Sequence, residues 1–280
     1  MTTILNPLPF DAQASLGRCK AVRARILEIS QRVTALHAAP AFSCVEIVDA
    51  IYYGLMRPAG SGDPNRFHDV FLMSKGHGCM TQYAVLESLG ILSRQEMDSY
   101  CTPAGILGAH PDRGNPGIEA STGSLGHGMG LAIGMAYGEK LLKSDQHVFA
   151  VLSDGELQEG SSWEGAMMAA NLNLDNLIVL VDLNDFGGLE RMSEGHKAFY
   201  PLDDKFRAFG WEVETVSGHD ATGIQSAVAR RTGSKPFALL CKTVKGRGVS
   251  YMEHVPIWHY RSPNAAEYAQ AMAELTEVRS

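Results

Sequence analysis

Two continuous apolar runs, separated by a helical segment, constrain the fold of this chain more than any other feature. The runs HVFAVL (147–152) and NLIVLVDL (176–183) do not alternate with polar residues, so both predict strands buried on both faces. The apolar residues of 156–171 recur with a helical period, and this segment joins the two runs. A strand–helix–strand unit of this kind predicts a parallel sheet with helices on both faces.

The rest of the chain repeats this alternation without an internal repeat or a composition shift. Short apolar runs predict further strands at 70–73, 211–216 and 237–244. Helical periodicity predicts helices at 14–39, 44–56, 78–89, 126–143 and 220–232, and a helical C-terminal tail at 264–278. We therefore expect one α/β domain over residues 1–280, with a doubly wound, mainly parallel sheet and the N-terminal helices packed on it.

Charge and cysteine usage restrict the partners and the compartment. The formal net charge of −7 over 280 residues argues against non-specific binding to nucleic acid or to an anionic membrane. The uncharged run from Ala120 to Gly138 is too rich in Gly, Ser and His for a membrane span, and the N-terminus lacks the pattern of a signal peptide. The five cysteines are scattered, which is typical of reduced thiols. We expect a cytoplasmic protein that binds neither membranes nor nucleic acid.

Four glycines stand at four-residue intervals along the helix predicted from residue 126. These are Gly126, Gly130, Gly134 and Gly138. This spacing places them on one helical face, where the missing side chains permit close approach of another backbone. One interpretation is tight packing inside the domain, and the other is a contact between subunits.

Polar side chains follow two of the predicted strands. Asp154 comes after the strand at 147–152, and Asn184 comes after the strand at 176–183. Ligands of parallel sheets gather at the carboxyl ends of the strands, and Mg²⁺ prefers oxygen ligands that it shares with phosphates. Backbone amides at the start of the 156–171 helix favour a diphosphate nearby. The alternative is that Asp154 caps a helix and Asn184 makes a turn.

An ordered set of motifs carries a resemblance to a known family. In chain order the motifs are His37, SKGH (74–77), AHPD (109–112), STGSLGHG (121–128), SDGELQEG (153–160) and LND (183–185). From about residue 15 to 262 the chain resembles the N-terminal half of transketolase. The Asp-Gly start and the later Asn resemble the thiamine diphosphate motif. The chain departs from the family at Ser153, at His127 and in the segment LHAAPAFS after residue 35.

The resemblance implies a role for each matching residue. Asp154, Asn184 and the backbone carbonyl of Phe186 would hold Mg²⁺, or another divalent cation such as Ca²⁺ or Mn²⁺. The cofactor would contact His77, Gly123, Ser124, Leu125, Gly155, Glu156 and His259, in addition to Asp154 and Asn184. The catalytic histidines would be His37, His77, His110 and His259. Glu159 and Glu164 would lie towards the subunit interface. The basic segment Lys242, Lys245 and Arg247 fits either a phosphate-steering role or a solvated loop.

The resemblance also implies an activity and a partner. The expected reaction is transfer of a two-carbon ketol unit from a ketose phosphate to an aldehyde acceptor, with thiamine diphosphate as cofactor. A second subunit would carry the pyrimidine-binding and C-terminal domains, and two copies of each would form an α2β2 heterotetramer. The alternatives are the corresponding subunit of a thiamine diphosphate 2-oxoacid dehydrogenase or decarboxylase, and a non-catalytic paralogue.

Overall fold

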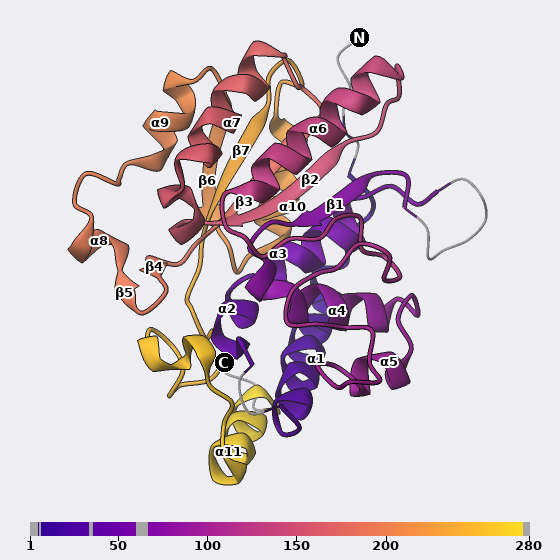
Figure 1. The fold of residues 1–280 in the computed structure, drawn as a ribbon, viewed down its shortest axis with the longest axis vertical. Coiled ribbons are helices and arrows are strands. Elements are labelled where there is room, and N and C mark those ends of the chain that lie inside the picture. The colour runs from indigo at the N-terminus through magenta and orange to yellow at the C-terminus, as the bar shows by residue number, and fades with distance from the viewer. Residues whose placement is uncertain (1–4, 6, 34–35, 60–66, 277–280) are drawn as a thin grey trace.

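A parallel sheet forms the centre of the molecule (Figure 1). The computed structural model describes residues 5, 7–33, 36–59 and 67–276, and in these residues the sheet has five strands in the order β1-β2-β3-β7-β6. The strands are β1 (Val70–Met73), β2 (Val148–Ser153), β3 (Leu177–Leu183), β6 (Glu212–Ser217) and β7 (Phe237–Lys242). A separate hairpin pairs β4 (Phe186–Gly187) with β5 (Glu190–Arg191). The sequence-predicted strands are therefore confirmed.

Helices cover both faces of the sheet. They are α1 (Ala12–Ser30), α2 (Ala38–Ser43), α3 (Val45–Ala50), α4 (Cys79–Ser88), α5 (Arg94–Asp98), α6 (His127–Leu141), α7 (Gly160–Asn171), α8 (Met192–Gly195), α9 (Leu202–Ala208), α10 (Ala221–Arg230) and α11 (Ala265–Thr276). A π-helical turn occupies Ile51–Leu55, and 3₁₀ turns occupy Gly76–Gly78, Gly155–Gln158 and Pro256–Tyr260. In Figure 1, α6 and α7 lie side by side in front of the strands, and the N-terminal helices lie below them.

Alternate residues of each strand enter two different hydrophobic clusters. Phe149 and Val151 join the cluster formed with α1–α4 and α10, whereas Ala150 and Leu152 join the cluster formed with α6, α7 and α9. Because successive strand residues point to opposite faces, continuous apolar strands require both clusters. The expectation of a doubly wound α/β fold with a parallel sheet is confirmed.

Two predicted helices differ from those observed. The helix predicted at 14–39 ends at Ser30, and α2 starts separately at Ala38. Pro40 lies in the first turn of α2, where a missing backbone N–H costs little, so it marks a new helix start. The helix predicted at 156–171 is a 3₁₀ turn followed by α7, because Glu159 between them has an extended backbone (φ −73°, ψ 125°). The segment PAGSGDPNR (58–66) has the glycines and prolines typical of a loop, and most of it lies outside the described residues.

The glycine stripe of α6 does not arise from packing inside the domain. A Cβ atom added at Gly130, Gly134 or Gly138 would meet no atom within 4 Å. Internal packing explains only Gly126, where an added Cβ would lie 2.5 Å from the Cβ of Glu159. The internal-packing interpretation is therefore wrong for the other three glycines.

The structure also bears on two sequence expectations, that the cysteines are unpaired and that the chain has no membrane span. All five cysteines are free, and only Cys101 is exposed. No helix within the described ranges has the length and apolar character needed to cross a bilayer.

Candidate functional site

The ends of β2 and β3 bring the predicted metal ligands together. Ser153 on β2 pairs with Asp182 on β3, so Asp154 and Asn184 follow two neighbouring strands at nearly the same level. The Asp154 carboxylate accepts hydrogen bonds from the backbone N–H groups of Gly155 (2.9 Å) and Asp185 (2.5 Å). The side-chain oxygen of Asn184 accepts from the N–H of Phe186 at 3.1 Å. Asp154 and Asn184 are both buried, which places their oxygens away from bulk solvent.

Gly155 fits a space that a larger residue would fill. An added Cβ atom at this position would lie 3.1 Å from the carbonyl oxygen of Phe186. The carbonyl predicted as a metal ligand thus lies directly against the turn that carries Asp154. The site offers a carboxylate, an amide oxygen and a backbone carbonyl, which are the hard oxygen donors that Mg²⁺ binds. The residues present therefore fit a divalent cation.

Electrostatics at the strand ends also favour a cation. Burial, with the nearby Asp182 carboxylate, raises the pKa of Asp154 to about 7. Because burial disfavours the ionised form of this carboxylate, a positive charge that binds to it would stabilise that form. Asp182 already has its own counter-charge, because it forms a fully buried ion pair with Lys75. Asp154, in contrast, accepts hydrogen bonds from backbone N–H groups and forms no ion pair within the described residues, so an added cation can neutralise its charge.

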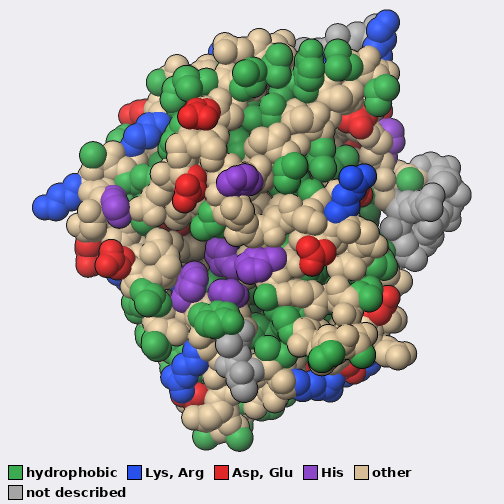
Figure 2. Space-filling view, viewed as in Figure 1, with side chains coloured by type: hydrophobic (Ala, Val, Ile, Leu, Met, Phe, Trp, Pro, Cys, Tyr) green, Lys and Arg blue, Asp and Glu red, His purple; other side chains and the backbone are tan. Residues whose placement is uncertain are grey.

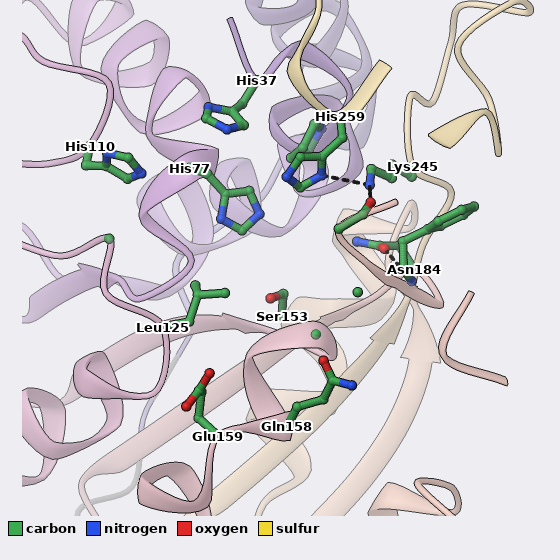
Figure 3. A pocket seen from close by; sticks show the side chains of 16 residues that line it. His37, His77, His110, Leu125, Ser153, Gln158, Glu159, Asn184, Lys245 and His259 are labelled. Atoms are coloured by element: carbon green, nitrogen blue, oxygen red, sulfur yellow. Dashed lines mark hydrogen bonds between the residues drawn. The ribbon is translucent and has the colours of Figure 1, made fainter. Parts of the chain in front are cut away.

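A pocket with a volume of about 290 Å³ opens over these strand ends. Its lining residues are His37, Pro40, His77, His110, Gly123, Leu125, Ser153, Gly155, Gln158, Glu159, Asn184, Phe186, Gly187, Gly188, Lys245 and His259. In Figure 3 the four histidines gather on one side of the pocket, and Ser153, Gln158 and Glu159 lie on the other. The pocket therefore has a strand end and a histidine end.

The histidine end is assembled from four separate segments. The ring centroid of His37 lies 5.7 Å from that of His77, 6.1 Å from that of His110 and 5.4 Å from that of His259. Burial is the main cause that lowers the pKa of His37 to about 4 and that of His259 to about 3. Burial likewise lowers the pKa of His77 well below its usual value. These three rings are neutral at pH 7, so each can donate one hydrogen bond and accept another.

The long loop between α5 and α6 places His110 in the pocket. The Tyr83 hydroxyl donates a hydrogen bond to the His110 carbonyl at 2.9 Å, and the Thr122 hydroxyl donates to the Met73 carbonyl at 2.6 Å. Gly123 has φ +133°, and an added Cβ atom there would lie 2.7 Å from the His110 ring. Glycine is thus required at residue 123 both for its backbone conformation and for the approach of His110.

Lys245 belongs to the pocket, so its interpretation as part of a solvated loop is wrong. Only 2% of this residue is exposed, and it follows β7, the strand next to β3. Its ammonium group donates to the Gly188 carbonyl at 2.7 Å and lies 2.9 Å from Nδ1 of His259 (Figure 3). Burial and the charge of Lys75 lower the pKa of Lys245 to about 8. In the sequence, its position at the end of the buried strand predicted at 237–244 is the feature that indicates membership of the site.

Several predicted residues lie outside the pocket lining. One of them is Asp154, which is fully buried between the lining residues Ser153 and Gly155 of the chain. Ser124 is exposed, and Glu164 is exposed on α7. Glu156 is fully buried beneath the site, where it accepts hydrogen bonds from the Ser74 hydroxyl (2.5 Å) and the Gly126 N–H (3.0 Å). Glu156 thereby joins the end of β1 to the start of α6. Glu159, predicted at the interface, lines the pocket.

Comparisons with known proteins agree with this geometry. Residues 17–274 match the family described as "Transketolase, thiamine diphosphate binding domain". The chain is 35% identical to one of the subunits of an apulose-4-phosphate transketolase from Phocaeicola vulgatus, with 91% of each chain covered. It is also 35% identical to a 6-deoxy-6-sulfo-D-fructose transketolase subunit of a Clostridium species, with 91% of this chain and 93% of the relative covered.

Solved transketolases share the fold. The match to transketolase from Leishmania mexicana has a TM-score of 0.83 at 25% identity and covers 96% of this chain. The match to the Campylobacter jejuni enzyme has a TM-score of 0.86 at 23% identity and covers 95% of this chain. The chain spans 42% and 43% of the lengths of these two proteins. From the family match and the two relatives of similar length, we conclude that the chain belongs to the transketolase family, as a thiamine diphosphate binding domain.

Proposed function

We propose that this chain is the diphosphate-binding subunit of a thiamine diphosphate-dependent transketolase. The chain forms one domain over residues 1–280 and acts in the cytoplasm. With its partner it transfers a two-carbon ketol unit from a ketose phosphate to an aldehyde acceptor. The observation that carries the proposal is the pocket that joins Asn184 and Phe186, beside the buried Asp154, to a cluster of neutral histidines. Relatives of nearly the same length are named as transketolase subunits, which supports the same function.

Each end of the pocket has a separate role in this function. Asp154, Asn184 and the Phe186 carbonyl would hold Mg²⁺, or Ca²⁺ or Mn²⁺, and the cation would neutralise the cofactor's diphosphate. Lys245 adds a positive charge beside them. Thiamine diphosphate, when bound, supplies the nucleophilic carbon and the electron sink for breaking and forming the carbon–carbon bond. Neutral His37 and His259 donate and accept hydrogen bonds, which suits them to orient sugar hydroxyls and to move protons.

We infer that a second subunit completes the enzyme and covers α6 and α7. These helices expose Leu131, Tyr137, Leu141, Met167 and Met168, each with at least 40% of its surface exposed. Figure 2 shows hydrophobic side chains gathered over this part of the molecule. Exposed apolar patches beside a row of unoccluded glycines are typical of protein interfaces. Glu164 lies on the same helix pair, in accord with its predicted interface position.

The expected partner carries the pyrimidine-binding and C-terminal domains, in an α2β2 heterotetramer. The test combines this chain with such a partner, thiamine diphosphate and Mg²⁺, and measures ketol transfer from ketose phosphates. We expect activity from the mixture and none from either protein by itself. Robust transfer by this chain without the partner, or consumption of 2-oxoacids in place of ketoses, contradicts the proposal. Mg²⁺-dependent cofactor binding by the mixture excludes a non-catalytic paralogue that has lost the site.

A further inference from the structure

Tyr260 stands beside the histidine end of the pocket although it was not among the predicted site residues. The centroid of its ring lies 4.5 Å from that of His37, with 48° between the ring planes. This is the shortest of the ring separations given above for His37. Tyr260 is 56% exposed and does not itself line the pocket, so it lies on the surface beside the lining residue His37.

The segment that carries Tyr260 is held firmly in place. The neighbouring Trp258 is buried, and its ring packs 4.9 Å from that of Tyr251. The guanidinium of Arg261 lies 4.2 Å from the Trp258 ring centroid and pairs with Glu267 of α11 at 2.7 Å. An exposed aromatic side chain on such an anchored turn has a fixed position at little entropic cost when a ligand contacts it.

Two adjacent residues of this turn face the same histidine. His259 meets the His37 ring at 87° with centroids 5.4 Å apart, and Tyr260 covers another part of that ring. The Tyr260 hydroxyl makes no hydrogen bond within the described residues. The side chain thus offers an apolar ring and a polar tip at the pocket opening, a combination suited to a sugar chain, which has C–H faces and hydroxyl groups.

We propose that Tyr260 determines which donor sugars the enzyme accepts, an inference that depends on the proposed function. The two carbons that are transferred must lie inside the pocket, next to the cofactor. The remainder of a ketose donor must then extend towards the opening, where the Tyr260 ring stands over His37. Tyr260 contacts this remainder, so it selects donors by the length and shape of the chain beyond the transferred unit.

The test compares long and short donors in the complex with the partner subunit. The long donor is a ketose phosphate. The short donor is 3-hydroxy-2-oxopropanoate, which gives the same two-carbon unit with loss of CO₂ and has no sugar chain beyond it. We expect Tyr260→Ala to lower kcat/KM for the ketose about tenfold, which is the size of effect expected for loss of one apolar contact. For the short donor, kcat/KM is expected to stay within about twofold of wild type. Tyr260→Phe retains the ring and loses only the hydroxyl, so kcat/KM for the ketose is expected to lie between those of wild type and Tyr260→Ala.

Controls separate this role from others. Ile257→Ala changes another exposed apolar residue of the same turn and leaves both donors unchanged. Cofactor affinity and partner affinity, measured by titration calorimetry, are expected to be the same for Tyr260→Ala and wild type. An equal loss for both donors, or weaker binding of the cofactor or of the partner, overturns the role of Tyr260. Absence of ketol transfer from either donor by the wild-type complex overturns the proposed function and this inference together.

Discussion

The two ends of the pocket are built in different ways. At the strand end, Asp154, Asn184 and Lys245 follow three neighbouring strands, so the register of β2, β3 and β7 fixes their positions. At the histidine end, His37, His77, His110 and His259 come from segments that share no sheet or helix and meet only through tertiary packing. The comparison indicates that the strand end is positioned by the register of one sheet, whereas the positions at the histidine end depend on how four separate segments pack together.

The largest expected effect is at the strand end. Asp154→Asn removes the carboxylate from the proposed cation site, and we expect Mg²⁺-dependent affinity for thiamine diphosphate to fall by about 100-fold or more. Titration calorimetry of the complex measures this change. Asp204→Asn, on the exposed side of α9, is the control and leaves the affinity unchanged. Unaltered cofactor affinity in Asp154→Asn would contradict the assignment of the two ends.

The matching change at the histidine end is His37→Ala. We expect kcat/KM for a ketose phosphate to fall about 30-fold, because hydrogen bonds to substrate hydroxyls are lost. Cofactor affinity stays within about twofold, because no cation ligand changes. Steady-state kinetics and calorimetry on one preparation separate the two quantities. His196→Ala, at an exposed histidine after α8, serves as the control. If cofactor affinity in His37→Ala fell by the same factor as kcat/KM, the result would contradict the separate roles of the strand end and the histidine end.

A smaller effect tests how tightly the strand end is built. Gly155→Ala places a methyl group 3.1 Å from the Phe186 carbonyl, closer than an ordinary contact. Since overpacking of a close contact costs about 1–3 kcal/mol, we expect cofactor affinity in Mg²⁺ to fall about tenfold. Gly160→Ala, where an added Cβ would meet no atom within 4 Å, is the matched control. Equal affinities of the two variants would show that the Phe186 carbonyl does not contribute.

The smallest effect concerns stability and belongs to the histidine end. Histidines of the unfolded chain take up protons near pH 6.5. In the folded chain the pKa is about 4 for His37 and about 3 for His259. Between these values the unfolded state binds more protons, so the free energy of unfolding falls as the pH drops from 6.5 towards 4. In urea unfolding at pH 7 and pH 5, His37→Gln is expected to lose less stability on acidification than wild type or His196→Gln. Equal losses in all three proteins would contradict the low pKa.

The two ends also differ in how far the sequence predicts them. The strand pattern predicts that Asp154 and Asn184 lie near each other, because buried parallel strands align their carboxyl ends. No periodicity relates His110 to His259, so only the family resemblance predicted their meeting. The sequence does not decide between the two interpretations of Lys245, because the order of strands in the sheet, with β7 next to β3, is set by tertiary packing. No sequence pattern distinguishes Tyr260, because its exposure and its contact with the His37 ring are properties of the folded chain.

The helix boundaries were less predictable than the strands for a related reason. Apolar residues continue past Ser30 with helical spacing, but the chain turns there to start α2 and present His37 to the pocket. Glu156 matched the motif, yet its side chain lies beneath the site because Ser74 and Gly126 donate to it there. In both cases the packing around the site overrides the local pattern.

Anomalous diffraction from crystals of the complex grown with thiamine diphosphate and Mn²⁺ tests the central claim most directly. We expect one strong manganese peak within coordination distance, about 2.2 Å, of an Asp154 oxygen, the Asn184 side-chain oxygen and the Phe186 carbonyl, with the diphosphate completing the shell. A peak at any other position, or a bound cofactor whose diphosphate lies away from these three residues, contradicts the account.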